Sequence, residues 1–145
     1  MKHKISVFGL GYVGLPLAIE FSKYFKTIGY DANNERINEL KSFKDSNNEI
    51  SKNIIKNSNI KFKNNLNDLK KSNTYIVTVP TPIDKLNKPD LTSIYNTCKN
   101  IGNLLKKKDL VIFESTVYPG LTEEKCIPLI EKISKLKLNR DFYCG

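Results

Sequence analysis

The sequence has few of the features that mark secreted or membrane proteins. It contains no tryptophan, one methionine and one histidine among 145 residues. No apolar run approaches the ~20 residues of a membrane-spanning helix. The residues after Met1 pass directly into a predicted strand, without the apolar segment and cleavage site of a secretory signal. We therefore expect a cytoplasmic protein of one domain, residues 1–145, with no membrane partner and no bound metal.

Cysteine is also scarce, and its spacing excludes the common paired motifs. Cys98, Cys126 and Cys144 form no C-x-x-C pair, so we expect reduced thiols. Cys98 and Cys126 each fall on the apolar stripe of a predicted helix. This placement indicates core positions and argues against a nucleophilic role.

Acidic residues are outnumbered: 15 Asp and Glu stand against 24 Lys and Arg, for a net charge of +9. The lysines are scattered along the sequence, with short runs only at Lys70-Lys71 and Lys106–Lys108. A nucleic-acid face would require a clustered basic patch with aromatic residues between the charges, and the sequence shows none. We expect a solvated, lysine-rich surface and no nucleic-acid partner. The excess positive charge would still help to attract an anionic cofactor or nucleotide substrate.

What the sequence does contain is a G-x-G-x-x-G motif directly after a predicted strand. An apolar run over residues 5–8 predicts the strand, and Gly9, Gly11 and Gly14 follow it. Gly9 permits the tight turn out of the strand, Gly11 lets a pyrophosphate approach the backbone, and Gly14 lets a helix lie close to the strand. The helix N-terminus offers free N–H groups to phosphates. The motif predicts a dinucleotide site; the alternative is a glycine-rich turn without a ligand.

An acidic residue completes the motif. The predicted helix carries an apolar stripe at Val13, Leu17 and Phe21, with Leu15, Ala18 and Ile19 beside it, and a second strand over residues 27–30 then ends in Asp31. A carboxylate at this place accepts both hydroxyls of an adenosine ribose and repels a 2′-phosphate. The sequence therefore predicts NAD, in preference to NADP, as the cofactor.

The next segment supplies one further candidate ligand. Asn33 is a predicted cap of a helix over residues 35–40, and Arg36 lies in its first turn, where a cation is unfavourable for the helix dipole. We expect Arg36 either to contact the adenosine end of the cofactor or to be a solvated surface residue. Residues 42–59 are polar and asparagine-rich. We expect them to be the least structured part of the chain, with a short helix around residues 50–55.

Two later strands end in polar loops. A β-branched run over residues 75–79 predicts a central strand that stops at Pro80-Thr81-Pro82, a stiff loop. Another strand, over residues 110–113, leads to Ser115 and Thr116. Ligands bind at the carboxyl ends of parallel strands, so Thr81, Ser115 and Thr116 are candidate cofactor contacts. For Thr81 the alternative is a rigid loop without a ligand.

The remaining predicted elements complete an alternating order. They are an edge strand over 60–62, a helical turn over 66–71, a helix over 91–105 capped by Asp90, a helix over 120–136 and a strand over 141–144. Pro128 should bend the helix that contains it. The alternation predicts a Rossmann-like, doubly wound α/β fold with a parallel six-stranded sheet in the order 3-2-1-4-5-6.

With these motifs assembled, the sequence resembles the N-terminal NAD-binding domain of the UDP-glucose/GDP-mannose dehydrogenase family. The segments that carry the resemblance are VFGLGYVGLPLA (7–18), GYDANNERI (29–37), IVTVPTPID (76–84), KPDLTSI (88–94), ESTVYPGLTEE (114–124) and DFYCG (141–145). They are distributed over the whole chain except its asparagine-rich middle. The form of TVPTPID and ESTVYPG is most similar to that of bacterial enzymes that act on UDP-N-acetylhexosamines for surface polysaccharides such as capsules.

The resemblance implies a reaction and residue roles. Members of the family oxidise the C6 alcohol of a nucleotide sugar to a carboxylate with NAD, through an aldehyde, a cysteine-bound thiohemiacetal and a thioester. By resemblance, the backbones of Tyr12 and Val13 contact the pyrophosphate, Asp31 and Arg36 hold the adenosine end, and Thr81 and Thr116 line the nicotinamide side. Thr116 also matches a threonine that helps to position the catalytic water.

Other parts of the family pattern have no counterpart in this sequence. None of the three cysteines matches the nucleophile, and the family's catalytic lysine and asparagine, sugar-nucleotide domain and dimerising helix lie beyond the matched region. We therefore expect a cofactor domain that is inactive alone, as a truncation or a split gene, with UDP-sugar binding and homodimer formation only in the full-length enzyme. One alternative is a stand-alone dinucleotide-binding or interaction module without catalysis. Another is an S-adenosylmethionine-dependent methyltransferase-like domain, against which Gly14 and the Thr81 and Thr116 loops argue.

Overall fold

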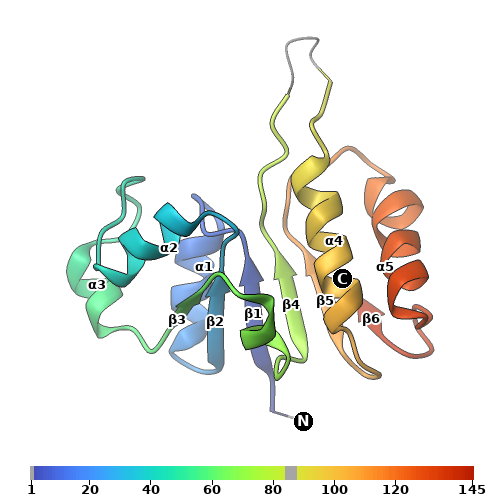
Figure 1. Cartoon of the computed structure of the whole chain (residues 1–145), viewed down its shortest axis with the longest axis horizontal. Helices are drawn as coiled ribbons and strands as arrows, with labels where there is room; N and C mark the ends of the chain where they lie inside the picture. The colour runs from blue at the N-terminus through green and yellow to red at the C-terminus, as the bar shows by residue number, and fades with distance from the viewer. Residues whose placement is uncertain (1, 84–87) are drawn as a thin grey trace.

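A parallel six-stranded sheet forms the centre of the computed structural model, which describes residues 2–83 and 88–145 (Figure 1). The strand order is β3-β2-β1-β4-β5-β6, which confirms the predicted topology. The strands are β1 (Lys4–Phe8), β2 (Lys26–Tyr30), β3 (Lys61–Lys63), β4 (Thr74–Val77), β5 (Leu110–Phe113) and β6 (Tyr143–Cys144). Because all their pairings are parallel, every strand begins at one edge of the sheet, the amino edge, and ends at the other, the carboxyl edge.

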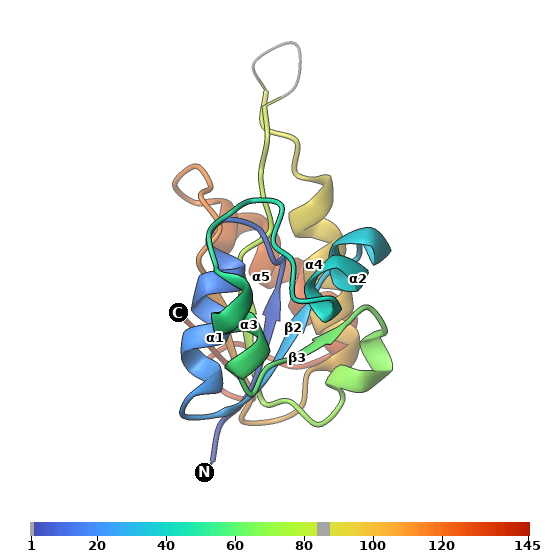
Figure 2. The same ribbon diagram turned by 90° about the vertical axis from the view of Figure 1, so that its left-hand side faces the viewer.

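Helices cover both faces of this sheet (Figure 2). They are α1 (Gly14–Ser22), α2 (Asn34–Lys41), α3 (Lys52–Asn57), α4 (Thr92–Leu104) and α5 (Ile127–Ser134), with a 3-10 turn at Leu66–Leu69 and a π-helical turn at Thr122–Cys126. The first three helices pack into the core on one face, and α4 and α5 pack into the core on the other. Within the described ranges no helix has both the length and the apolar character needed to cross a membrane.

The central strand β1 connects the two cores. Val7 packs on the α1 side, whereas Phe8 packs on the α4 side, where its ring centroid lies 5.0 Å from that of Tyr30 and 6.4 Å from that of Tyr75. Both faces of β1 are therefore buried. This explains why the strand reads as a continuous apolar run and not as an alternating pattern.

Helix α1 buries the residues beside the predicted stripe more deeply than the stripe itself. The residues it buries are Gly14, Leu15, Ala18, Ile19 and Ser22. Val13 is 56% exposed, and Leu17 and Phe21 are only partly buried against the same core. The predicted stripe was wrong at Val13, because Gly14 lies directly against the backbone of Gly9 and so decides which side of the helix faces the sheet.

The helix predicted over residues 120–136 is divided in two. The π-helical turn at Thr122–Cys126 precedes α5, and Pro128 lies in the first turn of α5. The residues before the proline are already helical, so Pro128 lies within a continuous helical run over residues 121–134. The helix type changes just before the proline, and the bend stays a prediction. The core positions predicted for Cys98 and Cys126 are confirmed, because both side chains are fully buried.

The asparagine-rich segment is organised around one carboxylate. Residues 42–51 form no helix or strand, but the Asp45 side chain is only 1% exposed. It accepts the backbone N–H groups of Asn47, Glu49 and Ile50 at distances between 2.9 and 3.2 Å. The short helix predicted nearby is confirmed as α3. The rest of the segment is irregular, as expected, but composition does not reveal that Asp45 holds its turn together.

Helix starts agree with the predictions except at one position. Asn33 accepts the N–H groups of Glu35 and Arg36 at the start of α2, as predicted. At α4 the capping position falls on Leu91 instead of Asp90, although Asp90 Oδ1 still accepts the N–H of Thr92 at 2.9 Å. The carboxylate therefore stabilises the helix start from one residue further out.

Candidate functional site

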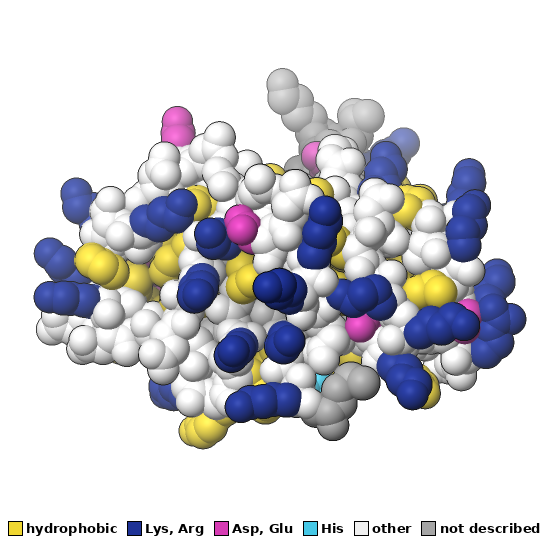
Figure 3. All heavy atoms as spheres, turned by 60° about the horizontal axis from the view of Figure 1, so that its bottom comes forward, with side chains coloured by type: hydrophobic (Ala, Val, Ile, Leu, Met, Phe, Trp, Pro, Cys, Tyr) yellow, Lys and Arg dark blue, Asp and Glu magenta, His cyan; other side chains and the backbone are white. Residues whose placement is uncertain are grey.

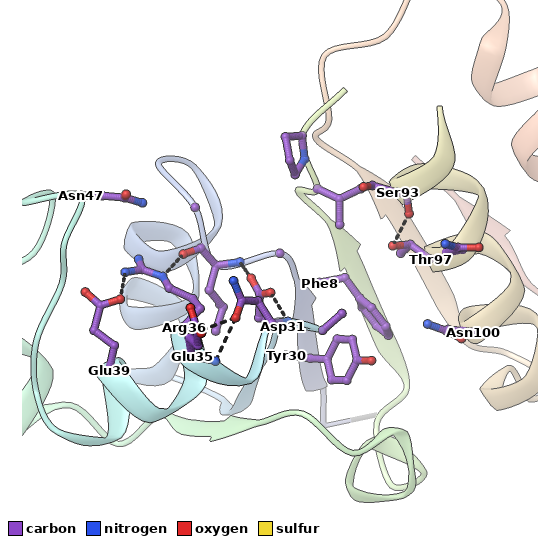
Figure 4. Close-up of a pocket in the computed structure, with 18 of the residues that line it drawn as sticks. Phe8, Tyr30, Asp31, Glu35, Arg36, Glu39, Asn47, Ser93, Thr97 and Asn100 are labelled. Atoms are coloured by element: carbon purple, nitrogen blue, oxygen red, sulfur yellow. Dashed lines mark hydrogen bonds and ion pairs between the residues drawn. The ribbon is translucent and has the colours of Figure 1, made fainter. Parts of the chain in front are cut away.

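A cleft of about 780 Å³ opens at the carboxyl edge of the sheet, between the β1–β2 half of the molecule and α4 (Figure 4). Its volume is within the ~300–1,000 Å³ typical of ligand pockets. The chain runs outward from β1 through β2 to β3 on one side, then crosses back to β4, which pairs with β1 on the other side. Open α/β sheets bind ligands at such a switch point. Of the predicted cofactor residues, the cleft is lined by Gly9, Gly11, Asp31 and Arg36.

The three glycines of the motif have three different surroundings. Gly9 has a φ of 94°, and a Cβ there would lie 2.9 Å from Val79 Cα. A Cβ on Gly14 would overlap the carbonyl oxygen of Gly9 and the hydroxyl of Thr78, so only glycine lets α1 lie this close to β1. A Cβ on Gly11 would meet nothing within 4 Å. The fold thus requires glycine at positions 9 and 14, because a Cβ would clash there. At Gly11 no such clash exists, and the open space fits the approach of a pyrophosphate.

Asp31 lies at the end of β2 with its carboxylate fixed in place. Oδ2 accepts the backbone N–H of Leu10 at 2.9 Å, and Oδ1 accepts that of Asn33 at 2.9 Å. A carboxylate oxygen has a second lone pair, so both oxygens can still accept hydrogen bonds from a ligand in the cleft. The two N–H groups therefore orient the carboxylate and leave a lone pair on each oxygen for a ligand.

Arg36 is held in the wall of the cleft by protein contacts. Its Nε donates to the carbonyl oxygen of Leu10 at 2.9 Å, and Nη1 lies 3.2 Å from Glu39 Oε2. Nη2 lies 2.8 Å from Asp45 Oδ1, as an ion pair without the alignment of a hydrogen bond. The side chain is 10% exposed. The alternative of a solvated arginine was therefore wrong.

The carboxylates beside Arg36 are charged at neutral pH. Burial raises the pKa of Asp45, but the Arg36 guanidinium and the N–H groups of Ile50 and Asn47 outweigh it, so the pKa lies below its ordinary value. The pKa of Glu39 is also lowered, because Ser46 and Arg36 outweigh burial. Arg36 is thus neutralised by two acids and does not offset the negative charge of Asp31.

The opposite wall of the cleft comes from α4, and the sequence analysis did not identify it. Its residues are Ser93, Asn96, Thr97 and Asn100. Thr97 Oγ1 donates to the carbonyl oxygen of Ser93 at 2.9 Å, whereas the side-chain amides of Asn96 and Asn100 bond to no other described residue. Steps of three and four place these polar residues on one helical face. That spacing was readable in the sequence as a polar helical face, but the sequence does not show that the face borders the cleft.

The three hydroxyl residues predicted at strand ends lie together, but beside the cleft. Thr81 Oγ1 donates to the carbonyl oxygen of Thr116, and Ser115 Oγ donates to that of Val79 at 2.7 Å. The loops that follow β4 and β5 therefore meet at the carboxyl edge of the sheet. None of the three residues is among those that line the cleft in the described part of the chain.

Tyr12 and Val13 lie at the rim of the glycine loop and not in the cleft lining. Their side chains are 67% and 56% exposed. Their backbone N–H groups precede the first turn of α1 and bond to no described residue. Free N–H groups at a helix start are the donors that bind phosphate oxygens.

The three thiols differ in the direction of their pKa shifts. The neighbouring Cys126 thiol and burial raise the pKa of Cys98, and burial raises the pKa of Cys144 to about 11, whereas the hydrogen bond with Cys98 lowers the pKa of Cys126. All three cysteines are free. Among the described residues, no cluster of three His, Cys, Asp or Glu side chains could hold a metal ion.

The fold, the glycine loop and the acid that ends β2 define a dinucleotide-binding Rossmann domain of the dehydrogenase type. The profile of the UDP-glucose/GDP-mannose dehydrogenase family, NAD binding domain, matches residues 3–145. The chain belongs to this family as its NAD-binding domain, and its cofactor is NAD. The resemblance noted in the sequence is confirmed.

Individual relatives agree with this assignment. Protein CapL of Staphylococcus aureus is 48% identical over 145 residues, which are 100% of this chain and 34% of that protein. UDP-N-acetyl-D-glucosamine 6-dehydrogenase of Pseudomonas aeruginosa is 52% identical over 143 residues, 98% of this chain and 34% of that protein. The structure of UDP-D-ManNAc dehydrogenase from Pyrococcus horikoshii superposes with a TM-score of 0.89 at 35% identity, covering 97% of this chain and 35% of that one. The chain thus spans about a third of the length of these relatives.

Proposed function

We propose that this chain is the cofactor domain of a cytoplasmic nucleotide-sugar 6-dehydrogenase. The complete enzyme oxidises the C6 alcohol of a UDP-hexose or UDP-N-acetylhexosamine to the uronate, for surface polysaccharides such as capsules, and acts as a homodimer. Family membership supports the reaction class, and the relatives named as UDP-N-acetylhexosamine dehydrogenases support the sugar class. The chain spans about a third of the length of these relatives. We therefore propose that the isolated chain binds NAD but does not oxidise the sugar.

The oriented carboxylate of Asp31 carries the proposal. Its free lone pairs accept the two hydroxyls of the adenosine ribose, and its charge repels the phosphate of NADP. The adenine lies on the planar face of Arg36, whose edges are occupied by Leu10, Glu39 and Asp45. This arrangement binds the adenosine end of NAD without supplying a free cation for a 2′-phosphate.

The rest of the cofactor follows the loops along the carboxyl edge. The pyrophosphate occupies the space at Gly11 and accepts the N–H groups of Tyr12 and Val13, while Gly9 and Gly14 shape the loop. The nicotinamide side reaches Thr81, Ser115 and Thr116, with Thr116 also orienting the attacking water in the complete enzyme. Bound NAD supplies the hydride acceptor.

Calorimetric titration of the purified chain with NAD, NADP and S-adenosylmethionine tests the cofactor assignment. We expect saturable binding of NAD alone. Asp31→Ala should weaken NAD binding by about 1.5–3 kcal/mol, the range for hydrogen bonds to a charged group. Glu49→Gln, an exposed acid outside the cleft, is the matched control and should bind NAD normally. Unchanged affinity in Asp31→Ala would show that the ribose is held elsewhere.

An activity assay separates the cofactor domain from the alternatives. We expect no NADH formation when the purified chain is given NAD and UDP-N-acetylglucosamine. Steady-state turnover by the chain alone would contradict its proposed dependence on a further domain. A protein of greater length that contains this chain is then assayed for oxidation of a UDP-sugar. If the chain binds NAD but every such protein is inactive, the stand-alone module is the correct interpretation.

A further inference from the structure

The amino edge of the sheet carries a cluster of exposed lysines that the cofactor site does not use. The members of this basic face are Lys2, Lys4, Lys26, Lys61, Lys70, Lys71, Lys106, Lys107 and Lys108, all exposed. Each lies at the start of a strand or in the segment just before one. Parallel strands bring these positions to one edge, and Figure 3 shows Lys and Arg side chains distributed over that face with few acids between them. The fold thus gathers lysines that the sequence analysis described as scattered.

The carboxylates of this edge do little to neutralise the lysines. Asp109 and Asp141 are 3% and 9% exposed, and each accepts a backbone N–H at 2.9 Å, from Lys106 and Lys137 respectively. Lys107 is the member of the basic face that forms an ion pair, at 3.8 Å from Asp141, among the described residues. The face therefore presents a largely uncompensated positive charge.

The arrangement works against folding stability in one place. Lys4 and Lys26 are direct neighbours in the register of β1 and β2. Like charges directly opposite one another in a sheet are destabilising. This repulsion would be relieved by an anion bound between the two strands, and folding alone gives no reason for it.

The chemistry of the face favours a surface of diffuse negative charge. Its unpaired cations are lysines, because the arginine of this edge, Arg140, is paired with Asp141 at 2.7 Å. Lysines are compact point charges without the forked geometry by which arginine reads bases and phosphates bidentately. The charges are spread across the face in two dimensions and do not follow a line, as a nucleic-acid backbone would require (Figure 3). Tyr24, 71% exposed, lies between Lys23 and Lys26 in the turn before β2. Tyrosine beside lysine is typical of the membrane–water interface.

We propose that the basic face binds anionic phospholipid headgroups at a membrane surface. The attraction of each lysine acts within a Debye length of about 8–10 Å, so a flat array can engage several headgroups at once. Binding is electrostatic and reversible, with the tyrosine ring at headgroup level and no spanning segment. The cofactor cleft, at the opposite edge of the sheet, stays open to solution. This proposal departs from the sequence expectation of no membrane partner and does not depend on the proposed function.

Vesicle sedimentation of the native chain gives the first test. We expect binding to phosphatidylcholine vesicles that contain about one third phosphatidylglycerol, and at least about tenfold weaker binding to phosphatidylcholine alone. Binding to the anionic vesicles should fall steeply as salt is raised. Equal binding to both vesicle types, or salt-independent binding, would overturn the proposal.

A charge-matched pair of variants locates the binding to this face. The quadruple variant Lys4→Gln, Lys26→Gln, Lys70→Gln, Lys71→Gln removes exposed side chains that form no hydrogen bond or ion pair with another described residue. It should bind anionic vesicles at least about tenfold more weakly, since each lysine near a surface contributes about fivefold. The control variant is Lys41→Gln, Lys44→Gln, Lys99→Gln, Lys125→Gln, which has the same net charge and changes no residue of the basic face. It should bind like the native chain.

Two further outcomes would contradict the proposal. If both quadruple variants lose vesicle binding equally, net charge and not the face is responsible. If the native chain binds a DNA or RNA duplex more tightly than anionic vesicles at the same salt, the partner is a nucleic acid. Thermal unfolding and NAD titration of both variants verify that each is folded with an intact cleft.

Discussion

The two edges of the sheet differ in how their polar side chains are held. At the carboxyl edge each functional side chain has defined partners: Asp31 is fixed by two N–H groups, and Arg36 is held by a carbonyl oxygen and two acids. At the amino edge most lysines of the basic face have no carboxylate partner. The same parallel topology creates both edges, because it separates the loops that follow strands from those that precede them. Defined geometry suits a single ligand, and diffuse charge suits an extended surface.

The largest expected effect comes from breaking the defined edge at Gly14. Gly14→Ala places a Cβ onto the carbonyl oxygen of Gly9, so α1 must move away from β1. We expect the free energy of unfolding to fall by about 3 kcal/mol and NAD binding to be lost. Urea denaturation and calorimetry measure the two effects.

Gly11→Ala is the matched control for that substitution. The Cβ enters open space, so we expect a change of less than ~1 kcal/mol in the free energy of unfolding. NAD affinity should still fall by at least about tenfold, because the methyl group occupies the space assigned to the pyrophosphate. Equal destabilisation by both substitutions would refute the distinction between a packing glycine and a ligand-approach glycine.

A smaller effect is expected from Asp45, which links the asparagine-rich segment to the cleft. Asp45→Asn removes the charge that faces Arg36 and weakens the turn that the carboxylate organises. We expect a loss of about 2 kcal/mol in the free energy of unfolding, with weaker NAD binding because Arg36 is no longer held in place. Glu49→Gln, an exposed acid in the same segment, should leave both quantities unchanged.

The smallest effect compares carboxylates of the two edges by their pH dependence. Burial raises the pKa of Asp109 despite the N–H and charge of Lys106 and the Tyr75 hydroxyl, whereas the pKa of Asp45 is lowered. A raised pKa in the folded state means that the contribution of Asp109 to stability is full in acid and is lost as the pH rises through that pKa. The contribution of Asp45 is full at neutral pH and is lost as the pH falls through its own pKa.

Urea unfolding over a pH series therefore distinguishes the two acids. The stability difference between the native chain and Asp109→Asn should decrease from acidic to neutral pH, and that between the native chain and Asp45→Asn should increase. If both differences change in the same direction, the assigned environments are incorrect. Neither result requires a change in the pKa of a lysine of the basic face.

Much of this structure followed from local sequence patterns. The strand order, the Asn33 cap and the buried cysteines were predicted because periodicity and capping act over a few residues. Gly9, Gly11 and Asp31, which local patterns singled out, line the cleft. The sequence was less informative where a distant contact decided the outcome. The buried face of α1 depends on Gly14 against Gly9, and the fixed turn at Asp45 depends on Arg36 in another element.

The sequence by itself determined the fold class, the cofactor motif and the family, since each is carried by residues close together in the chain. Only the tertiary structure decided that α4 forms the second wall of the cleft, that Arg36 is neutralised by Glu39 and Asp45, and that scattered lysines meet on one face. These features join residues from different elements. Their positions are set by the parallel sheet, which brings together at each edge segments that the sequence keeps apart.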